Sequence, residues 1–120
     1  MDMRLELVPL RSTDVDRSKT FYVERVGFVL DHDVEPGNGM RVVQMTPPGS
    51  ACSVVVGVGV GAPAPVVGLH LVVDDLELAR RTLAGNGVDV SDVQDMGGGV
   101  RYAYFSDPDG NSWALQEIRR

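Results

Sequence analysis

The stretch YFSDPDGNSWALQE (residues 104–117) decides the fold that this sequence predicts. Its centre, DPDG (107–110), has the residues of a tight turn: aspartate to open it, proline to fix φ, and glycine to close it. Apolar and aromatic residues dominate both sides of the turn. The segments 100–106 and 111–118 are therefore predicted to be two strands of a hairpin.

A second informative stretch, DVDRSKTFYVERVGF (14–28), reads as a helix followed by the start of a strand. Asp14 is a good N-cap, and Gly27 is a good stop. Between them, apolar and small residues recur at helical spacing. The same signals return later in the chain, where Asp74 or Asp75 caps a helix that Asn86-Gly87 ends.

The remaining segments have the composition or alternation of strands. They are residues 3–10, 28–33, 40–46, 51–56, 67–73 and 88–93. Each half then reads as strand, helix and three strands, which is an internal repeat of two βαβββ modules. The predicted class is α+β, in one domain over 1–120: module one at 1–57, a linker at 58–66 and module two at 67–120.

Composition narrows the function classes. The 120 residues carry 11 basic and 17 acidic side chains, a net charge of −6, which argues against nucleic acid as a partner. A single cysteine, Cys52, cannot form an internal disulfide. No run approaches the roughly 20 apolar residues that cross a membrane, and the first residues do not resemble a signal peptide. We expect a cytoplasmic protein without a membrane partner.

The stretch GVGVGAPAPVVG (57–68) resembles a phosphate-binding glycine loop only superficially. Such loops need a helix directly after the glycines, and Pro63 and Pro65 forbid one here. We interpret the stretch as a linker.

The two stretches 14–28 and 104–117, in this order around a repeat, are similar to the vicinal oxygen chelate superfamily. This group contains glyoxalase I, extradiol dioxygenases, fosfomycin-resistance enzymes and bleomycin-resistance proteins. The resemblance covers nearly the whole chain. It implies two βαβββ modules that form a cupped mixed sheet, with helices outside and a ligand pocket inside, and it implies a homodimer.

Many members of that group hold a divalent metal through histidine and glutamate side chains inside the cup. By the resemblance, three ligand positions fall on Leu7, Gly68 and Ala114, and a fourth lies on the strand at 51–56, which offers Cys52 and Ser53. The first three side chains have no donor atom for a metal. The chain is therefore predicted to bind no metal and to use no cofactor.

Polar side chains on the same strand faces are the remaining candidates. Strand alternation puts His70 with Gly68, puts Gln116 with Ala114, and puts Tyr102 with Tyr104. In resistance enzymes and dioxygenases of the group, a tyrosine at the place of Tyr104 faces the ligand. We predict His70 and Tyr104 as catalytic residues if the protein is an enzyme. The predicted ligand-binding residues are Gln116, Tyr102, Gln44, Leu7, Gly68 and Ala114.

Each candidate also has a plain structural interpretation, since a strand histidine or tyrosine is often only a packing residue. Two functions follow. The first is a metal-free protein that sequesters or carries a small organic ligand. The alternative is a glyoxalase-like lyase or isomerase, or a metal-dependent glyoxalase or dioxygenase. A dimeric scaffold without a ligand is a third option.

Overall fold

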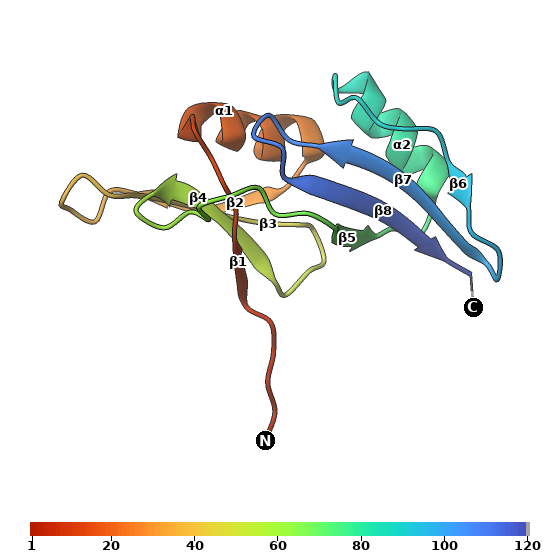
Figure 1. Ribbon diagram of the computed structural model, residues 1–120, viewed down its shortest axis with the longest axis horizontal. Coiled ribbons are helices and arrows are strands. Elements are labelled where there is room, and N and C mark those ends of the chain that lie inside the picture. Colours follow the sequence, from red (N-terminus) through yellow and green to blue (C-terminus); the bar gives the residue numbers. More distant parts are fainter. Residues whose placement is uncertain (120) are drawn as a thin grey trace.

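The elements of the computed structural model, which describes residues 1–119, follow the order β-α-β-β-β twice (Figure 1). The first half contains β1 (Leu7–Pro9), α1 (Val15–Thr20), which continues into the π-helical turn η1 (Phe21–Val26), β2 (Val29–Val34), β3 (Arg41–Thr46) and β4 (Ser53–Val58). The second half contains β5 (Leu69–Val72), α2 (Leu76–Gly85), β6 (Gln94–Asp95), β7 (Val100–Ser106) and β8 (Ser112–Ile118). The predicted α+β class is confirmed.

Each half forms one four-stranded mixed sheet. The strand orders are β1-β4-β3-β2 in sheet A and β5-β8-β7-β6 in sheet B. The pairs β1–β4 and β5–β8 are parallel, and the other pairs are antiparallel. Both helices lie on one side of the sheets, as the prediction of outer helices requires, and the opposite faces carry no helix (Figure 1).

Local sequence signals fix both helix starts. The Asp14 carboxylate accepts a hydrogen bond from the amide of Arg17, and the Asp75 carboxylate accepts one from Leu78. Asp75 is therefore the cap of α2, and Asp74 is not. At the end of η1, Gly27 has φ +95°, a left-handed conformation that glycine adopts without strain.

The two halves share one hydrophobic core under the helices. Phe21 and Tyr22 of η1 reach across to sheet B, with ring centroids 6.3 Å from Phe105 and 5.9 Å from Trp113. Both strand residues are buried, and Tyr22 is fully buried. The first helix thus covers strands of the second half, so neither half has a complete core of its own.

A buried polar network joins the DPDG turn to the first half. The Tyr22 hydroxyl donates to Asp107 and accepts from the indole N–H of Trp113. Burial and the nearby charge of Asp107 raise the pKa of Tyr22 far above its ordinary value, so the hydroxyl stays a donor. The Asn111 side chain donates to Asp107 and to the carbonyl oxygen of Arg11.

Two predicted strands differ from the structure. The predicted strand 3–10 is ordered as β1 only over Leu7–Pro9, and residues 1–6 extend away from the body of the protein (Figure 1). The predicted strand 88–93 is not a strand, and the second half gains instead the two-residue β6. The partner strand β4 begins at Ser53, whose amide donates to the carbonyl oxygen of Glu6. Within residues 1–119, no other backbone group pairs with the backbone of residues 1–6.

No helix within residues 1–119 is long and apolar enough to cross a membrane. The proposed module boundaries stay a prediction, although β4 continues as far as Val58.

Candidate functional site

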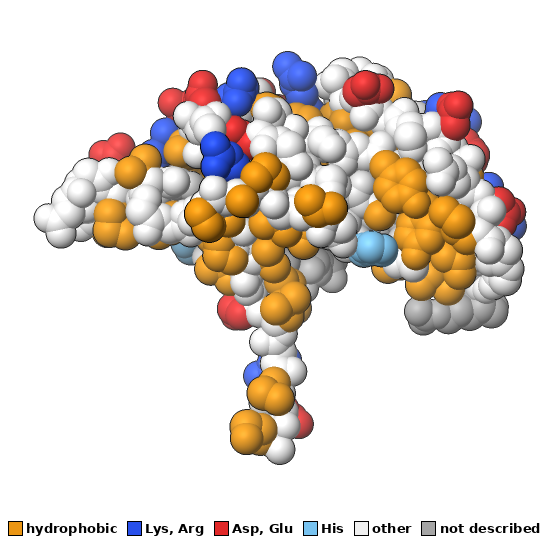
Figure 2. All heavy atoms as spheres, viewed as in Figure 1, with side chains coloured by type: hydrophobic (Ala, Val, Ile, Leu, Met, Phe, Trp, Pro, Cys, Tyr) orange, Lys and Arg blue, Asp and Glu red, His pale blue; other side chains and the backbone are white. Residues whose placement is uncertain are grey.

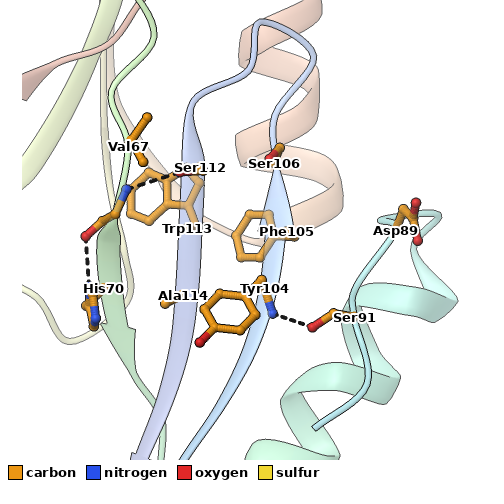
Figure 3. A pocket seen from close by; sticks show the side chains of 11 residues that line it. Val67, His70, Asp89, Ser91, Tyr104, Phe105, Ser106, Ser112, Trp113 and Ala114 are labelled. Atoms are coloured by element: carbon orange, nitrogen blue, oxygen red, sulfur yellow. Dashed lines mark hydrogen bonds between the residues drawn. The ribbon is translucent and has the colours of Figure 1, made fainter. Parts of the chain in front are cut away.

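A pocket of about 570 Å³ lies on sheet B and the segment that follows α2 (Figure 3). Its lining residues come from β5, β7, β8 and the segments that flank β5 and α2. They are Val67, Gly68, His70, Asp89, Ser91, Tyr104, Phe105, Ser106, Ser112, Trp113 and Ala114. This volume is in the range of sites for drug-sized molecules.

Strand register brings five predicted residues together on the helix-free face. Ala114 of β8 lies opposite His70 of β5 on one side and opposite Tyr104 of β7 on the other. Gln116 lies opposite Tyr102 in the next row. Directly paired strand residues point to the same face, so these side chains form two adjacent rows. Trp113 points the other way, into the core.

Three aromatic rings form a cluster on this face. Tyr102 and Tyr104 are stacked with centroids 6.0 Å apart and planes 14° apart. His70 meets Tyr102 edge to face, with centroids 5.6 Å apart. Both distances suit favourable aromatic pairs. The Tyr104 side chain lies over Ala114 and leaves 38% of the residue exposed (Figure 3). His70 and Tyr104 line the pocket, and Tyr102 packs against both rings from outside the lining.

The hydrogen bond of His70 fixes its neutral tautomer. Nδ1 of His70 lies 2.8 Å from the carbonyl oxygen of Gly68. A carbonyl oxygen only accepts, so Nδ1 carries the hydrogen in this bond. Nε2 of the neutral ring is then an acceptor. The imidazole thus presents a group that can accept a hydrogen bond or a proton from a bound molecule.

Gln116 and Tyr102 form a hydrogen-bonded pair in the neighbouring row. The side-chain amide of Gln116 donates to the Tyr102 hydroxyl, 2.9 Å away. The oxygen of Tyr102 is then an acceptor in this pair, and its own hydrogen is available to another molecule. The bond from Gln116 therefore leaves the Tyr102 hydroxyl free to donate a hydrogen bond.

Two predicted residues lie on the other sheet. Leu7 of β1 is opposite Ser53, and Gln44 of β3 is opposite His32 on one side and Val55 on the other. Neither Leu7 nor Gln44 lines the pocket on sheet B. Within one chain, the structure thus divides the predicted site between two sheets.

The donor chemistry of the site does not fit the metal of the superfamily. Gly68 and Ala114 lie in the pocket and Leu7 lies on sheet A, and their side chains hold no nitrogen, oxygen or sulfur. Within residues 1–119, no three histidine, cysteine or acidic side chains gather closely enough to hold an ion.

Sequence reasoning missed four polar residues of the pocket. Ser106 and Ser112 alternate with Tyr104 and Ala114, so the period-2 pattern does contain the signal for both. Asp89 and Ser91 lie on the predicted strand 88–93, and the Ser91 carbonyl is bound by Arg80 of α2. Nothing in the local pattern VDVSDV (88–93) indicates this.

Comparison with known proteins gives one family. The model for the glyoxalase/bleomycin resistance protein/dioxygenase superfamily matches residues 4–115. Among proteins whose functions have been curated, none matches this chain.

Solved structures agree over nearly the whole chain. TnmS3, an antibiotic binding protein from Streptomyces sp. CB03234, has a TM-score of 0.84 and 34% identity, with 98% of each chain covered. A glyoxalase/bleomycin resistance protein from the same strain has 38% identity and a TM-score of 0.72, and 92% of this chain and 96% of that chain are covered. A superfamily member from Sphaerobacter thermophilus DSM 20745 has 28% identity and a TM-score of 0.81, with 97% and 98% covered.

Proposed function

Because this chain belongs to the glyoxalase/bleomycin resistance protein/dioxygenase superfamily, we propose that it binds and sequesters or carries a small aromatic molecule, without a metal, on the helix-free face of sheet B. The observation that carries the proposal is the aromatic cluster of His70, Tyr102 and Tyr104 beside a pocket of about 570 Å³. The similarity to an antibiotic binding protein supports a small organic ligand. The superfamily also contains enzymes, so the fold alone does not decide between binding and catalysis.

The chemistry of the cluster supports a flat, oxygen-bearing ligand. A planar ring can stack on the exposed face of Tyr104, a contact that contributes about 0.5–1.5 kcal/mol beyond the area it buries. A hydroxyl on the ligand can donate to Nε2 of His70, and a carbonyl can accept from Tyr102. Gly68 has no side chain, which leaves room beside the Tyr104 ring for such a molecule.

A test should separate aromaticity from size. Naphthalene-1-carboxylate and its saturated analogue decahydronaphthalene-1-carboxylate have the same carbon skeleton and the same charge, but only the first is flat and aromatic. We expect calorimetric binding of the first and at least tenfold weaker binding of the second. Tyr104→Ala should abolish this preference. Flavone and 9-aminoacridine serve as two further flat aromatic probes. Equal affinity for both carboxylates, or no binding of any of the three aromatic probes, would contradict the proposal.

One observation favours an enzyme as a second candidate: Nε2 of His70 is a free acceptor beside the pocket, where it can take a proton from a bound molecule. A glyoxalase-like lyase or isomerase would use His70 as the base, with the Tyr104 hydroxyl to orient a substrate oxygen. Dicarbonyl compounds and thioesters are the substrates to screen. Turnover that His70→Ala abolishes would establish this candidate; tight binding without turnover would exclude it for that compound.

The proposed working form is a homodimer. β1 pairs only with β4 and β5 pairs only with β8 among the described residues, so each sheet has an open edge at its first strand. The N-terminal arm, residues 1–6, leaves β1 in an extended form (Figures 1 and 2). Met3 and Leu5 of this arm are 85% and 72% exposed. A strand-like arm with exposed apolar residues is suited to pair with the open edge of a second copy.

Such a dimer would also bring the divided site together. Leu7 and Gln44 lie on sheet A, whereas the aromatic cluster lies on sheet B. Facing sheet A of one copy with sheet B of the other would enclose the ligand between them. The proposed location of the protein is the cytoplasm, which rests on the sequence alone.

A further inference from the structure

The wall of the pocket beside Tyr104 is attached to β7 in an unusual way. The amide of Ser91 donates to the carbonyl oxygen of Tyr104 over 2.9 Å. In a regular antiparallel pair, the Tyr104 amide would donate back to the Ser91 carbonyl. It donates instead to the Ser91 hydroxyl oxygen, 2.8 Å away (Figure 3). One of the two backbone hydrogen bonds of a regular pair is therefore kept, and a hydrogen bond to a side chain replaces the other.

Helix α2 explains why the Ser91 carbonyl does not pair with β7. Nε of Arg80 donates to that carbonyl over 2.8 Å, and the same guanidinium forms an ion pair with Asp92 at 2.9 Å. A charged donor makes a stronger bond than a backbone amide. The carbonyl is thus held toward α2, and segment 88–93 does not become the strand that its sequence pattern predicts.

The Ser91 hydroxyl is fixed in the role of acceptor. Its hydrogen donates to the Asp92 carbonyl over 3.0 Å, which leaves its lone pairs for the Tyr104 amide. Every polar group of Ser91 therefore has a partner. The amide donates to Tyr104, the hydroxyl oxygen accepts from Tyr104, and the carbonyl oxygen accepts from Arg80. Ser91 lies in the pocket lining as well, between the helix and the ring that we propose binds the ligand.

We propose that Ser91 is a positioning residue of the site, which holds the Tyr104 backbone so that its ring lies over Ala114. Its role in binding rests on the proposed function, whereas its hold on Tyr104 does not. Without the hydroxyl, the Tyr104 amide has no acceptor. Either it turns to water, or segment 88–93 moves against β7 to supply a carbonyl. Both changes shift the Tyr104 ring relative to Ala114.

The hold on Tyr104 can be tested in the full chain without a ligand. In NMR spectra, Ser91→Ala should speed hydrogen exchange at the Tyr104 amide and move the Ala114 methyl signal, which lies next to the ring. Ser91→Thr keeps a hydroxyl acceptor and should restore both signals. Unchanged Tyr104 exchange and an unchanged Ala114 methyl in Ser91→Ala would overturn the proposal.

The role in binding is tested with naphthalene-1-carboxylate as the probe. Ser91→Ala should weaken its Kd about fivefold, the scale of one neutral hydrogen bond. Ser50→Ala is a matched control, because the Ser50 hydroxyl likewise accepts a backbone amide, from Cys52, outside the pocket. Its Kd should stay within twofold of the wild type.

A double variant separates positioning from general damage. If Ser91 acts through Tyr104, adding Ser91→Ala to Tyr104→Ala should change the Kd by less than twofold. An equal loss in both backgrounds would overturn the proposal. If the wild type binds no probe, the proposed function fails, and the NMR experiment alone decides whether Ser91 holds Tyr104.

Discussion

The hydroxyl of Tyr22, on the helix of the first half, donates a hydrogen bond of 2.6 Å to Asp107, 85 residues away in the turn of the second half. The same oxygen accepts from Trp113 over 2.9 Å. All three groups are buried. One phenol thus connects the cap of the β7–β8 hairpin to the helix that covers it.

The substitution Tyr22→Phe should therefore destabilise the folded protein. The change leaves a buried carboxylate and a buried indole N–H each short of one partner, which is expected to lower the free energy of unfolding by about 2–3 kcal/mol. Urea unfolding followed by Trp113 fluorescence measures it. Tyr104→Phe removes a hydroxyl from a partly exposed ring and should cost less than about 0.5 kcal/mol. A loss of that small size in Tyr22→Phe would contradict the role of the network.

Two glycines should respond in opposite directions to alanine. A Cβ on Gly57, in β4, would lie 1.9 Å from the carbonyl oxygen of Arg41, so the strands must separate. We expect Gly57→Ala to cost about 2 kcal/mol or more. A Cβ on Gly85, at the end of α2, meets nothing within 4 Å, and Gly85→Ala should stabilise by up to about 1 kcal/mol. Thermal unfolding of both variants decides, and equal effects would refute the packing argument.

Glu117 should make part of the stability dependent on pH. The hydrogen bonds from Arg101 lower the pKa of Glu117 below its ordinary value of about 4.3. A lowered pKa in the folded state gives stability that is present above the unfolded pKa and is lost as the pH falls below it. Glu117→Gln should lower the urea midpoint at pH 7, and the difference from the wild type should shrink by pH 3.

Glu35→Gln, in an exposed loop, is the control for this experiment. Its midpoint should follow the wild type at both pH values. A difference between Glu117→Gln and the wild type that stays constant with pH would show that the carboxylate charge does not matter.

The N-terminal arm should control the oligomeric state. Replacing Met3 and Leu5 with lysine puts two charges in place of exposed apolar side chains of the arm, and the proposed dimer should become a monomer in light scattering. Asp2→Asn with Arg4→Gln keeps these apolar side chains and should leave the dimer intact. A wild type that is monomeric at tens of micromolar would exclude the dimer.

Removal of metals should leave the protein unchanged. With no donor atoms at Leu7, Gly68 and Ala114, we expect dialysis against EDTA to alter neither the Tm nor the Kd for the naphthoate. Added Zn²⁺ or Ni²⁺ at one equivalent should shift the Tm by less than about 2 °C, because only an ion that binds the folded state preferentially raises it. A larger rise would contradict the metal-free site.

The sequence predicted those features that depend on local chemistry. Asp14 and Gly27 act as the helix boundaries that their residue types favour, and the DPDG turn closes the hairpin between β7 and β8. Alternation also grouped His70 with Gly68, Gln116 with Ala114, and Tyr102 with Tyr104 within their strands, whereas the common face of these strands was implied by the resemblance and agrees with the strand register. These signals need no knowledge of distant contacts.

Features that depend on contacts between elements were not predictable in this way. The pattern at 88–93 is that of a strand, yet the guanidinium of Arg80 holds the Ser91 carbonyl away from β7. The separation of Leu7 and Gln44 from the aromatic cluster depends on how the two sheets sit, which no local pattern encodes. The functional roles of all these residues stay predictions.

The contact of η1 with the strands of sheet B has a consequence for how the two halves can fold. A half whose helix covers the strands of the other half is not expected to fold on its own. Severing the loop at 58–66 would not free two small proteins. We expect two fragments that expose the aromatic residues now packed between them and that regain a native state only by associating.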